Sequence, residues 1–153
     1  KILESENAQS LSERLSILAS EKILNIIDDI FDDKAIFKKQ DDKNATYAKK
    51  IDKSEGVINW KEQSEKIIGK INGLYPSPGA WFLFNGERYK ILKATKHSSK
   101  GNPGYVLSDS LEVACGKNSL KIIEIQREGK KAQKINEFIQ GTKIKVGSNL
   151  NNA

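Results

Sequence analysis

An Asn-Gly pair at residues 85–86 constrains the fold of this chain more than any other feature. The apolar run AWFLF at residues 80–84 precedes it, and residues 87–95 alternate apolar and polar side chains, as at Tyr89 and Lys90. Asn-Gly between two such runs is typical of a two-residue β-hairpin turn, because both residues readily adopt a positive φ. The sequence therefore predicts two antiparallel strands joined by this turn.

Further strand-like runs follow the hairpin. They cover residues 105–108, 111–115 and 119–126, with Gly, Pro, Ser and Asn in the loops between them. Helical patterns flank the strands, one capped by Asn59 and ending at residues 72–73, the other at residues 135–139. Five short antiparallel strands with flanking short helices are typical of an oligonucleotide-binding (OB) barrel. We therefore expect an α+β fold with a five-stranded, OB-like β-barrel.

Near the N-terminus, apolar residues recur every three or four positions, which is the pattern of an amphipathic helix. This stripe comprises Leu11, Leu15, Leu18, Ala19, Ile23, Ile26, Ile27 and Ile30. Ser10 precedes it and Glu13 lies three residues further on, so we expect these two to form a capping box. No other segment before residue 56 offers an apolar face. We therefore expect the helix to pack on a domain absent from this sequence, or on the barrel.

The charge of the chain changes sign at about residue 45. Residues 1–44 contain 7 basic and 10 acidic side chains, whereas residues 45–153 contain 19 and 10. Clustered cations bind polyanions through counterion release, so the second part is expected to meet a polyanion. The alternative is a solvated lysine surface produced by AT-rich coding, because 23 of the 26 basic residues are Lys.

Composition indicates the kind of protein to which the chain belongs. None of its 153 residues is methionine, so we expect a fragment of a longer protein. One cysteine, Cys115, excludes an internal disulfide framework and is expected to be a small core residue. No apolar run approaches the roughly 18 residues that a membrane helix needs, and no signal peptide opens the chain, so we expect a soluble protein.

Several spaced strings resemble methionyl-tRNA formyltransferases, in the same order along the chain. They are ATYAKK at 45–50, GVINW at 56–60, YPSPGAW at 75–81, VACG at 113–116, QREGKK at 126–131 and FIQG at 138–141. Residues 45–146 resemble the C-terminal barrel domain of that family, and residues 2–36 resemble the last helix of its catalytic domain. The resemblance implies a helical remnant at 1–36, a linker at 37–55, where the sequence is polar and without sustained period, and a tRNA-binding domain at 56–153.

The resemblance implies the C-terminal part of an enzyme that transfers a formyl group from 10-formyltetrahydrofolate to the amino group of methionyl initiator tRNA. Its catalytic Asn, His and Asp and its folate loop belong to an N-terminal domain, and none of these motifs occurs here. We therefore expect no catalytic residue, bound cofactor or metal in this part, and His97 is expected to be a surface residue. The implied partners are initiator tRNA and the catalytic domain of the same chain. We expect a monomer without membrane contact, located in the cytoplasm of a bacterium or in the matrix of a bacterium-derived organelle.

The candidate tRNA-binding residues form three groups. The first group falls within eight residues around Gly129, in a turn that cannot bury its members, Arg127, Lys130, Lys131 and Lys134. The second group is Arg88 and Lys90, which share one face of a strand, with Lys93 on the other face. The third group lies in the linker and comprises Lys49, Lys50 and Tyr47. Each group has a plainer interpretation as solvated surface. Four other aromatic residues, Trp60, Trp81, Phe82 and Phe84, are expected in the core, which favours contacts with the phosphate backbone over base reading.

Two other functions remain open at this point. The first is the barrel of a related formyltransferase that acts on a sugar nucleotide or on formyltetrahydrofolate, which needs no basic groove. The second is a non-catalytic module that only packs against its neighbouring domain. Binding of tRNA compared with binding of small folates separates the first from the tRNA role, and substitution of Lys130 and Lys131 by Glu tests the second.

Overall fold

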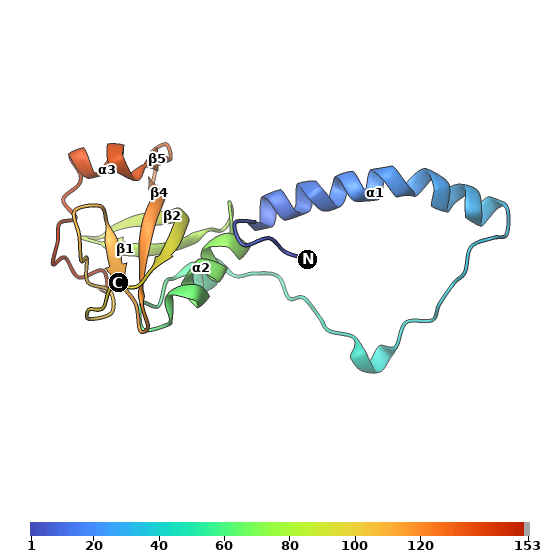
Figure 1. Ribbon diagram of the computed structural model, residues 1–153, viewed down its shortest axis with the longest axis horizontal. Coiled ribbons are helices and arrows are strands. Elements are labelled where there is room, and N and C mark those ends of the chain that lie inside the picture. Colours follow the sequence, from blue (N-terminus) through green and yellow to red (C-terminus); the bar gives the residue numbers. More distant parts are fainter. Residues whose placement is uncertain (152–153) are drawn as a thin grey trace. The chain divides into compact units, whose positions relative to one another are not determined.

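The computed structural model describes residues 1–151 and consists of two compact units, Lys1–Ile51 and Asp52–Ala153 (Figure 1). The first unit contains the helix α1 (Ala8–Phe31) and a short 3-10 turn at Asp42–Asn44. Within residues 1–151, no helix has the length and apolarity needed to cross a bilayer. The second unit contains every strand that the structure describes, together with two further α-helices.

The cap of α1 differs from the one expected from the sequence. Asn7 is the N-cap: its side chain accepts a hydrogen bond from the Ser10 backbone at 2.9 Å, and the Ser10 hydroxyl accepts one from the Asn7 backbone at 3.0 Å. The predicted box of Ser10 with Glu13 was wrong, because Ser10 already lies inside the first turn. No residue of α1 is buried, and all but the first of the apolar side chains in its stripe, for example Leu15, are exposed.

The second unit is built on a five-stranded antiparallel sheet. Its strands are β1 (Ala80–Phe84), β2 (Glu87–His97), β3 (Glu112–Ala114), β4 (Ser119–Arg127) and β5 (Gln133–Lys134). They pair in the order β1-β2-β4-β3, with β5 added to β4. This pairing gives an open sheet, and closure into the barrel expected from the sequence stays a prediction.

The hairpin prediction is confirmed. Ala80 pairs with Ile91 and Phe84 with Glu87, while Asn85 and Gly86 have φ values of 52° and 77°. Two successive positive φ values characterise the turn whose twist matches that of the flanking strands.

The predicted strand at residues 105–108 was wrong. Tyr105 and Val106 form only isolated bridges, to Asn149 and Val113 respectively, and the fifth strand is instead β5, which pairs with Glu124 and Ile125. The expected position of Lys93 on the opposite face of β2 also changes. Register shifts on both sides of Lys93 leave it exposed, while the next core residue is Ala94.

Two helices flank the sheet. α2 (Ser64–Gly73) begins later than predicted, because Asn59 caps only a local turn by accepting a 3.1 Å hydrogen bond from the Lys61 backbone. α3 (Ile135–Gly141) follows β5 directly and lies beside it, near one end of β4 (Figure 1). This position of α3 creates one wall of the candidate site described below.

The core contains a row of aromatic rings. Trp60, Phe82, Tyr89 and Phe138 follow one another with centroid separations of 5.8, 5.5 and 5.8 Å, and all four are almost fully buried. The core prediction is therefore confirmed for Trp60 and Phe82, whereas Trp81 and Phe84 are only partly buried.

Cys115 is buried as predicted, and burial raises the pKa of its thiol to about 12. A thiol with so high a pKa remains protonated at neutral pH, so Cys115 is a core residue rather than a nucleophile.

Candidate nucleic-acid interface

Two hollows lie on opposite faces of the sheet where β2 and β4 pair near Tyr89 and Arg127. Side chains alternate between the faces of a strand, so Tyr89 and Arg127 open on one face and Arg88 and Gln126 on the other. We call the first the α3 pocket, which has a volume of about 550 Å³, and the second the outer hollow, of about 240 Å³. Of the cations predicted from the sequence, Arg127, Lys130 and Lys131 line the α3 pocket, and Arg88 and Lys90 line the outer hollow.

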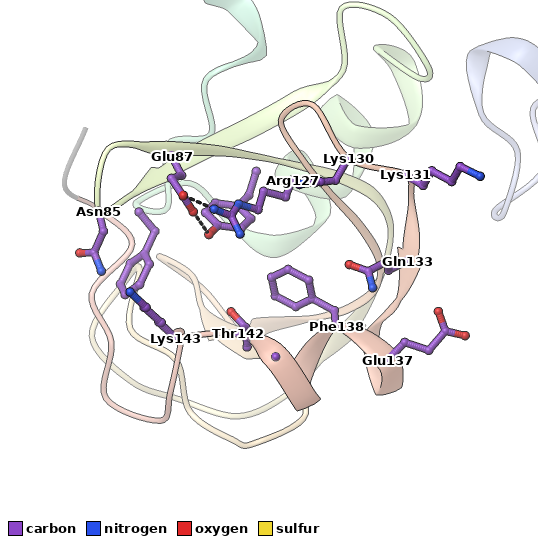
Figure 2. A pocket seen from close by; sticks show the side chains of 13 residues that line it. Asn85, Glu87, Arg127, Lys130, Lys131, Gln133, Glu137, Phe138, Thr142 and Lys143 are labelled. Carbon is purple, nitrogen blue, oxygen red and sulfur yellow. Dashed lines mark hydrogen bonds and ion pairs between the residues drawn. The ribbon is translucent and has the colours of Figure 1, made fainter.

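The α3 pocket lies between the β1–β2 hairpin, the β4–β5 turn and α3 (Figure 2). Its residues include aromatic, carboxylate and hydroxyl side chains together with a set of lysines. Among them are Phe84, Glu87, Tyr89, Arg127, Lys130, Lys131, Phe138, Thr142 and Lys143. Figure 2 shows Phe138 pointing into the pocket, whereas Lys131 extends away from it.

Glu87 joins the polar groups inside the α3 pocket. Its carboxylate accepts a 2.7 Å hydrogen bond from the Tyr89 hydroxyl and pairs with the Arg127 guanidinium. These two contacts, led by the Tyr89 bond, lower the pKa of Glu87. Burial first, and the neighbouring carboxylate second, raise the pKa of Tyr89 to about 12. Arg127 therefore lies in the predicted region, but its charge is already neutralised by Glu87.

The positive charge of Arg88, on the opposite face of the sheet, is also paired with a carboxylate. Its guanidinium pairs with the Glu128 carboxylate and lies 5.5 Å from the centroid of the Trp81 ring. Lys90 lines the same outer hollow and forms no ion pair with the residues that the structure describes. The predicted basic face of β2 is thus present, although one of its two cations is paired.

Four lysines in and near the β4–β5 turn and after α3 are available cations. Among residues 1–151, the ammonium groups of Lys130, Lys131, Lys134 and Lys143 form no hydrogen bond or ion pair. Three of them line the α3 pocket, and Lys134 lies next to it on β5. An anion at this surface would therefore bind these unpaired ammonium groups more readily than the paired guanidinium of Arg127.

The linker candidates belong to the other unit of the structure. Lys49 and Lys50 are exposed, and the side chain of Tyr47 is 93% exposed. They lie in a stretch without helix or strand, and RNA contact by each of these three residues stays a prediction.

Sequence reasoning missed several residues of the α3 pocket. Lys143 is the second residue after α3, in a Gly-Thr-Lys string, and like Lys130 it is an exposed lysine that closely follows a glycine. Phe84 was expected in the core and instead lines the pocket, as does Phe138 at its buried end. No sequence signal indicated that Glu87 would neutralise Arg127, because the two are 40 residues apart.

His97 is exposed, as expected, but it ends β2 instead of lying in the loop that its sequence context suggested. Its Nδ1 lies 2.7 Å from Glu112, which also accepts a 2.6 Å hydrogen bond from the buried Ser119 hydroxyl. Burial acts to raise the pKa of Glu112, but hydrogen bonds from Ser119, Ser99 and His97 outweigh it, so the pKa lies below its ordinary value. The cluster satisfies a nearly buried carboxylate, which is a structural role. Within residues 1–151, no three His, Cys, Asp or Glu side chains gather as metal ligands would.

Comparison with known proteins agrees with this fold. Residues 50–143 match the model of the formyl transferase, C-terminal domain. The chain is 59% identical, over 153 residues, to the methionyl-tRNA formyltransferase of Pelagibacter ubique, covering 99% of this chain and 49% of that one. It is 36% identical over 151 residues to the methionyl-tRNA formyltransferase of Bradyrhizobium diazoefficiens, again covering 49% of it. The chain thus spans about half the length of the curated relatives it matches.

Solved structures with a similar fold include HypX from Aquifex aeolicus. A substituted variant of HypX superposes with a TM-score of 0.66 at 17% identity, covering 92% of this chain and 28% of HypX. HypX in complex with tetrahydrofolic acid gives a TM-score of 0.57 at 19% identity, covering 80% of this chain and 23% of HypX. At these identities the likeness concerns the fold.

Proposed function

The chain belongs to the formyl transferase C-terminal domain family, and from this premise we propose that it is the tRNA-binding part of a methionyl-tRNA formyltransferase. In this proposal the complete enzyme transfers a formyl group from 10-formyltetrahydrofolate to the amino group of methionyl initiator tRNA. Two relatives support the proposal, since both are named methionyl-tRNA formyltransferase and their similarity covers 99% and 96% of this chain.

In this proposal catalysis and RNA binding belong to different domains, because the sequence contains basic residues but no catalytic motif of the family. The catalytic groups and the folate site belong to an N-terminal domain, for which residues 1–36 supply the last helix and residues 37–55 the linker. Residues 56–153 form the RNA-holding domain, for which an OB-like, barrel-type curvature of the sheet is proposed. The enzyme acts as a monomer in the bacterial cytoplasm or an equivalent organelle matrix.

One observation carries the RNA role, namely that Lys130 and Lys131 of the β4–β5 turn, with Lys134 and Lys143 nearby, lack partners in the described residues. A structural ion pair would occupy their ammonium groups, as Glu87 occupies Arg127 and Glu128 occupies Arg88. Free ammonium groups gathered at the rim of one pocket remain available to phosphates. The proposed contacts in the second unit are Lys130, Lys131 and Lys134, assisted by Lys143, with Arg127, Arg88 and Lys90 beside them. Lys49, Lys50 and Tyr47 of the first unit are proposed as separate RNA contacts.

Titration of the chain with initiator tRNA at several salt concentrations tests the proposal. If three phosphates are neutralised, the logarithm of the binding constant should fall with the logarithm of salt with a slope of roughly −2.7. A small folate serves as the comparison ligand. Absent or salt-independent tRNA binding, or folate binding in its place, would contradict the RNA role.

A further inference from the structure

The α3 pocket is larger and more aromatic than contact with a phosphate backbone requires. Its volume of about 550 Å³ falls within the range of roughly 300–1,000 Å³ typical of small-ligand sites. The outer hollow, by contrast, measures about 240 Å³ and is lined by Arg88, Lys90, Gln126, Glu128 and Gly129. The size and lining of the α3 pocket therefore suit a flat organic group as well as an anion.

Aromatic rings form the apolar part of the pocket. Tyr89 and Phe138 meet edge to face, with centroids 5.8 Å apart and planes at 80°, and fix each other's orientation. Phe84 packs against the core from the side but is only partly buried, so part of its side chain faces the pocket. Tyr89 and Phe138 are each 6% exposed, so Phe84 is the most accessible ring of the pocket, and aromatic rings are the usual partners of unstacked nucleic-acid bases.

The charges lie around these rings. Glu87 and Arg127 neutralise each other inside the pocket, so they add hydrogen-bonding groups without a net charge. Lys130 and Lys143, also pocket residues, have ammonium groups without a partner among the residues described. An anionic group would therefore bind the lysines, with an aromatic group against the rings. A nucleotide carries both groups on one molecule.

We propose that the α3 pocket binds a single unpaired nucleotide, with its base against Phe84 and Phe138 and its phosphate at Lys130 and Lys143. The inference rests on the proposed function and deepens it. The domain would bind one unpaired nucleotide of the RNA in addition to the phosphates of its double-stranded part. A free mononucleotide offers the same chemistry, so the test has one arm for each source.

The experiment compares three probes for binding to the whole chain at low salt. They are a fully paired RNA hairpin, the same hairpin with one bulged 2-aminopurine nucleotide, and AMP. We expect the bulged hairpin to bind about tenfold more tightly than the paired one, within the range for one stacked base. Its 2-aminopurine should also become protected from quenching by acrylamide, since the pocket shields the base.

Variants connect this preference to the pocket. Phe84→Leu keeps an apolar side chain but removes the ring, and should abolish the tenfold preference while the paired hairpin binds as before. Gly141→Leu places a side chain at the edge of the pocket, where a Cβ meets no atom within 4 Å, and should act in the same direction without disturbing the core. Tyr105→Leu is the matched control, because Tyr105 is 37% exposed and does not line the pocket.

The outcomes separate this inference from the proposed function. Equal binding of the two hairpins, with an unprotected base and no binding of AMP, would overturn the inference while leaving tRNA binding intact. Loss of both hairpins to the same extent in Phe84→Leu would also overturn it. Failure of every RNA to bind, including initiator tRNA, would contradict the proposed function, and AMP binding that depends on Phe84 would then support the pocket as a site for the free nucleotide.

Discussion

The guanidinium of Arg127, at the end of β4, pairs with the carboxylate of Glu87, the first residue of β2. The pair joins the two strands just beyond the point where Tyr89 and Arg127 face each other in the sheet. On the opposite face Arg88 and Glu128 repeat the arrangement with the signs exchanged between the strands. Both arginines of this region are therefore paired with carboxylates, whereas Lys130 and Lys131 of the β4–β5 turn have no ion-pair partner among the described residues.

Charge reversal at the turn should weaken binding of initiator tRNA. We expect Lys130→Glu combined with Lys131→Glu to reduce affinity at least about tenfold at low salt and to make the salt slope shallower, because phosphate contacts are lost. Affinity is measured by fluorescence anisotropy. The matched control reverses Lys38 and Lys39, an adjacent exposed pair in the other unit. Unchanged affinity in the first variant would favour a module that only packs against its neighbouring domain.

Removal of the Glu87 charge should have the opposite effect. Glu87→Gln keeps an acceptor for the Tyr89 hydroxyl but releases Arg127 from its ion pair, so tRNA affinity should increase a few-fold. Glu124→Gln is the control, because it changes the net charge equally and frees no arginine among the described residues. If both variants behave alike, net charge rather than the release of Arg127 explains the gain.

Tyr89 should ionise at a pH well above the ordinary tyrosine value. Its pKa is raised to about 12 from 10.0, first by burial and then by the hydrogen bond to Glu87. A raised pKa in the folded state stabilises the fold fully below pH 10, and this stabilisation is lost as the pH rises through 12. Absorbance titration near 295 nm, compared between wild type and Tyr89→Phe, isolates this group, and ionisation of Tyr89 near pH 10 would contradict the assignment.

Gly116 should not tolerate a side chain. A Cβ at this position would lie 1.9 Å from the Lys61 carbonyl oxygen, a backbone atom that cannot move aside easily. We expect Gly116→Ala to lower the free energy of unfolding by more than about 2 kcal/mol, measured by urea denaturation.

Gly69 is the matched control for that variant. It lies within α2 and is exposed, and a Cβ added there would meet nothing within 4 Å. Gly69→Ala should therefore raise the free energy of unfolding by about 0.5–1 kcal/mol, because alanine favours helix. Equal effects of the two variants would show that the contact with Lys61 does not govern Gly116.

Local signals were sufficient for some elements of the fold. The Asn85-Gly86 turn was predictable because its backbone conformation depends on those two residues, and α3 was predictable from its short apolar period. The core positions of Trp60 and Phe82 followed from their size and neighbours. The cap of α1 was placed three residues late, since Asn7 and Ser10 are both good caps and only the backbone at Asn7 decides between them.

By itself, the sequence determined the hairpin, the helical character of α1 and α3, the excess of basic residues after residue 45 and the strings that identify the family. Only the tertiary structure decided which short segment became the fifth strand, because a strand is defined by its hydrogen bonds to a neighbouring strand. β5 pairs with β4, whereas residues 105–108 form only isolated bridges. It also decided which cations are free. Ion pairs such as Arg127 with Glu87 join residues far apart in the chain, so no local pattern distinguishes a neutralised arginine from an available lysine.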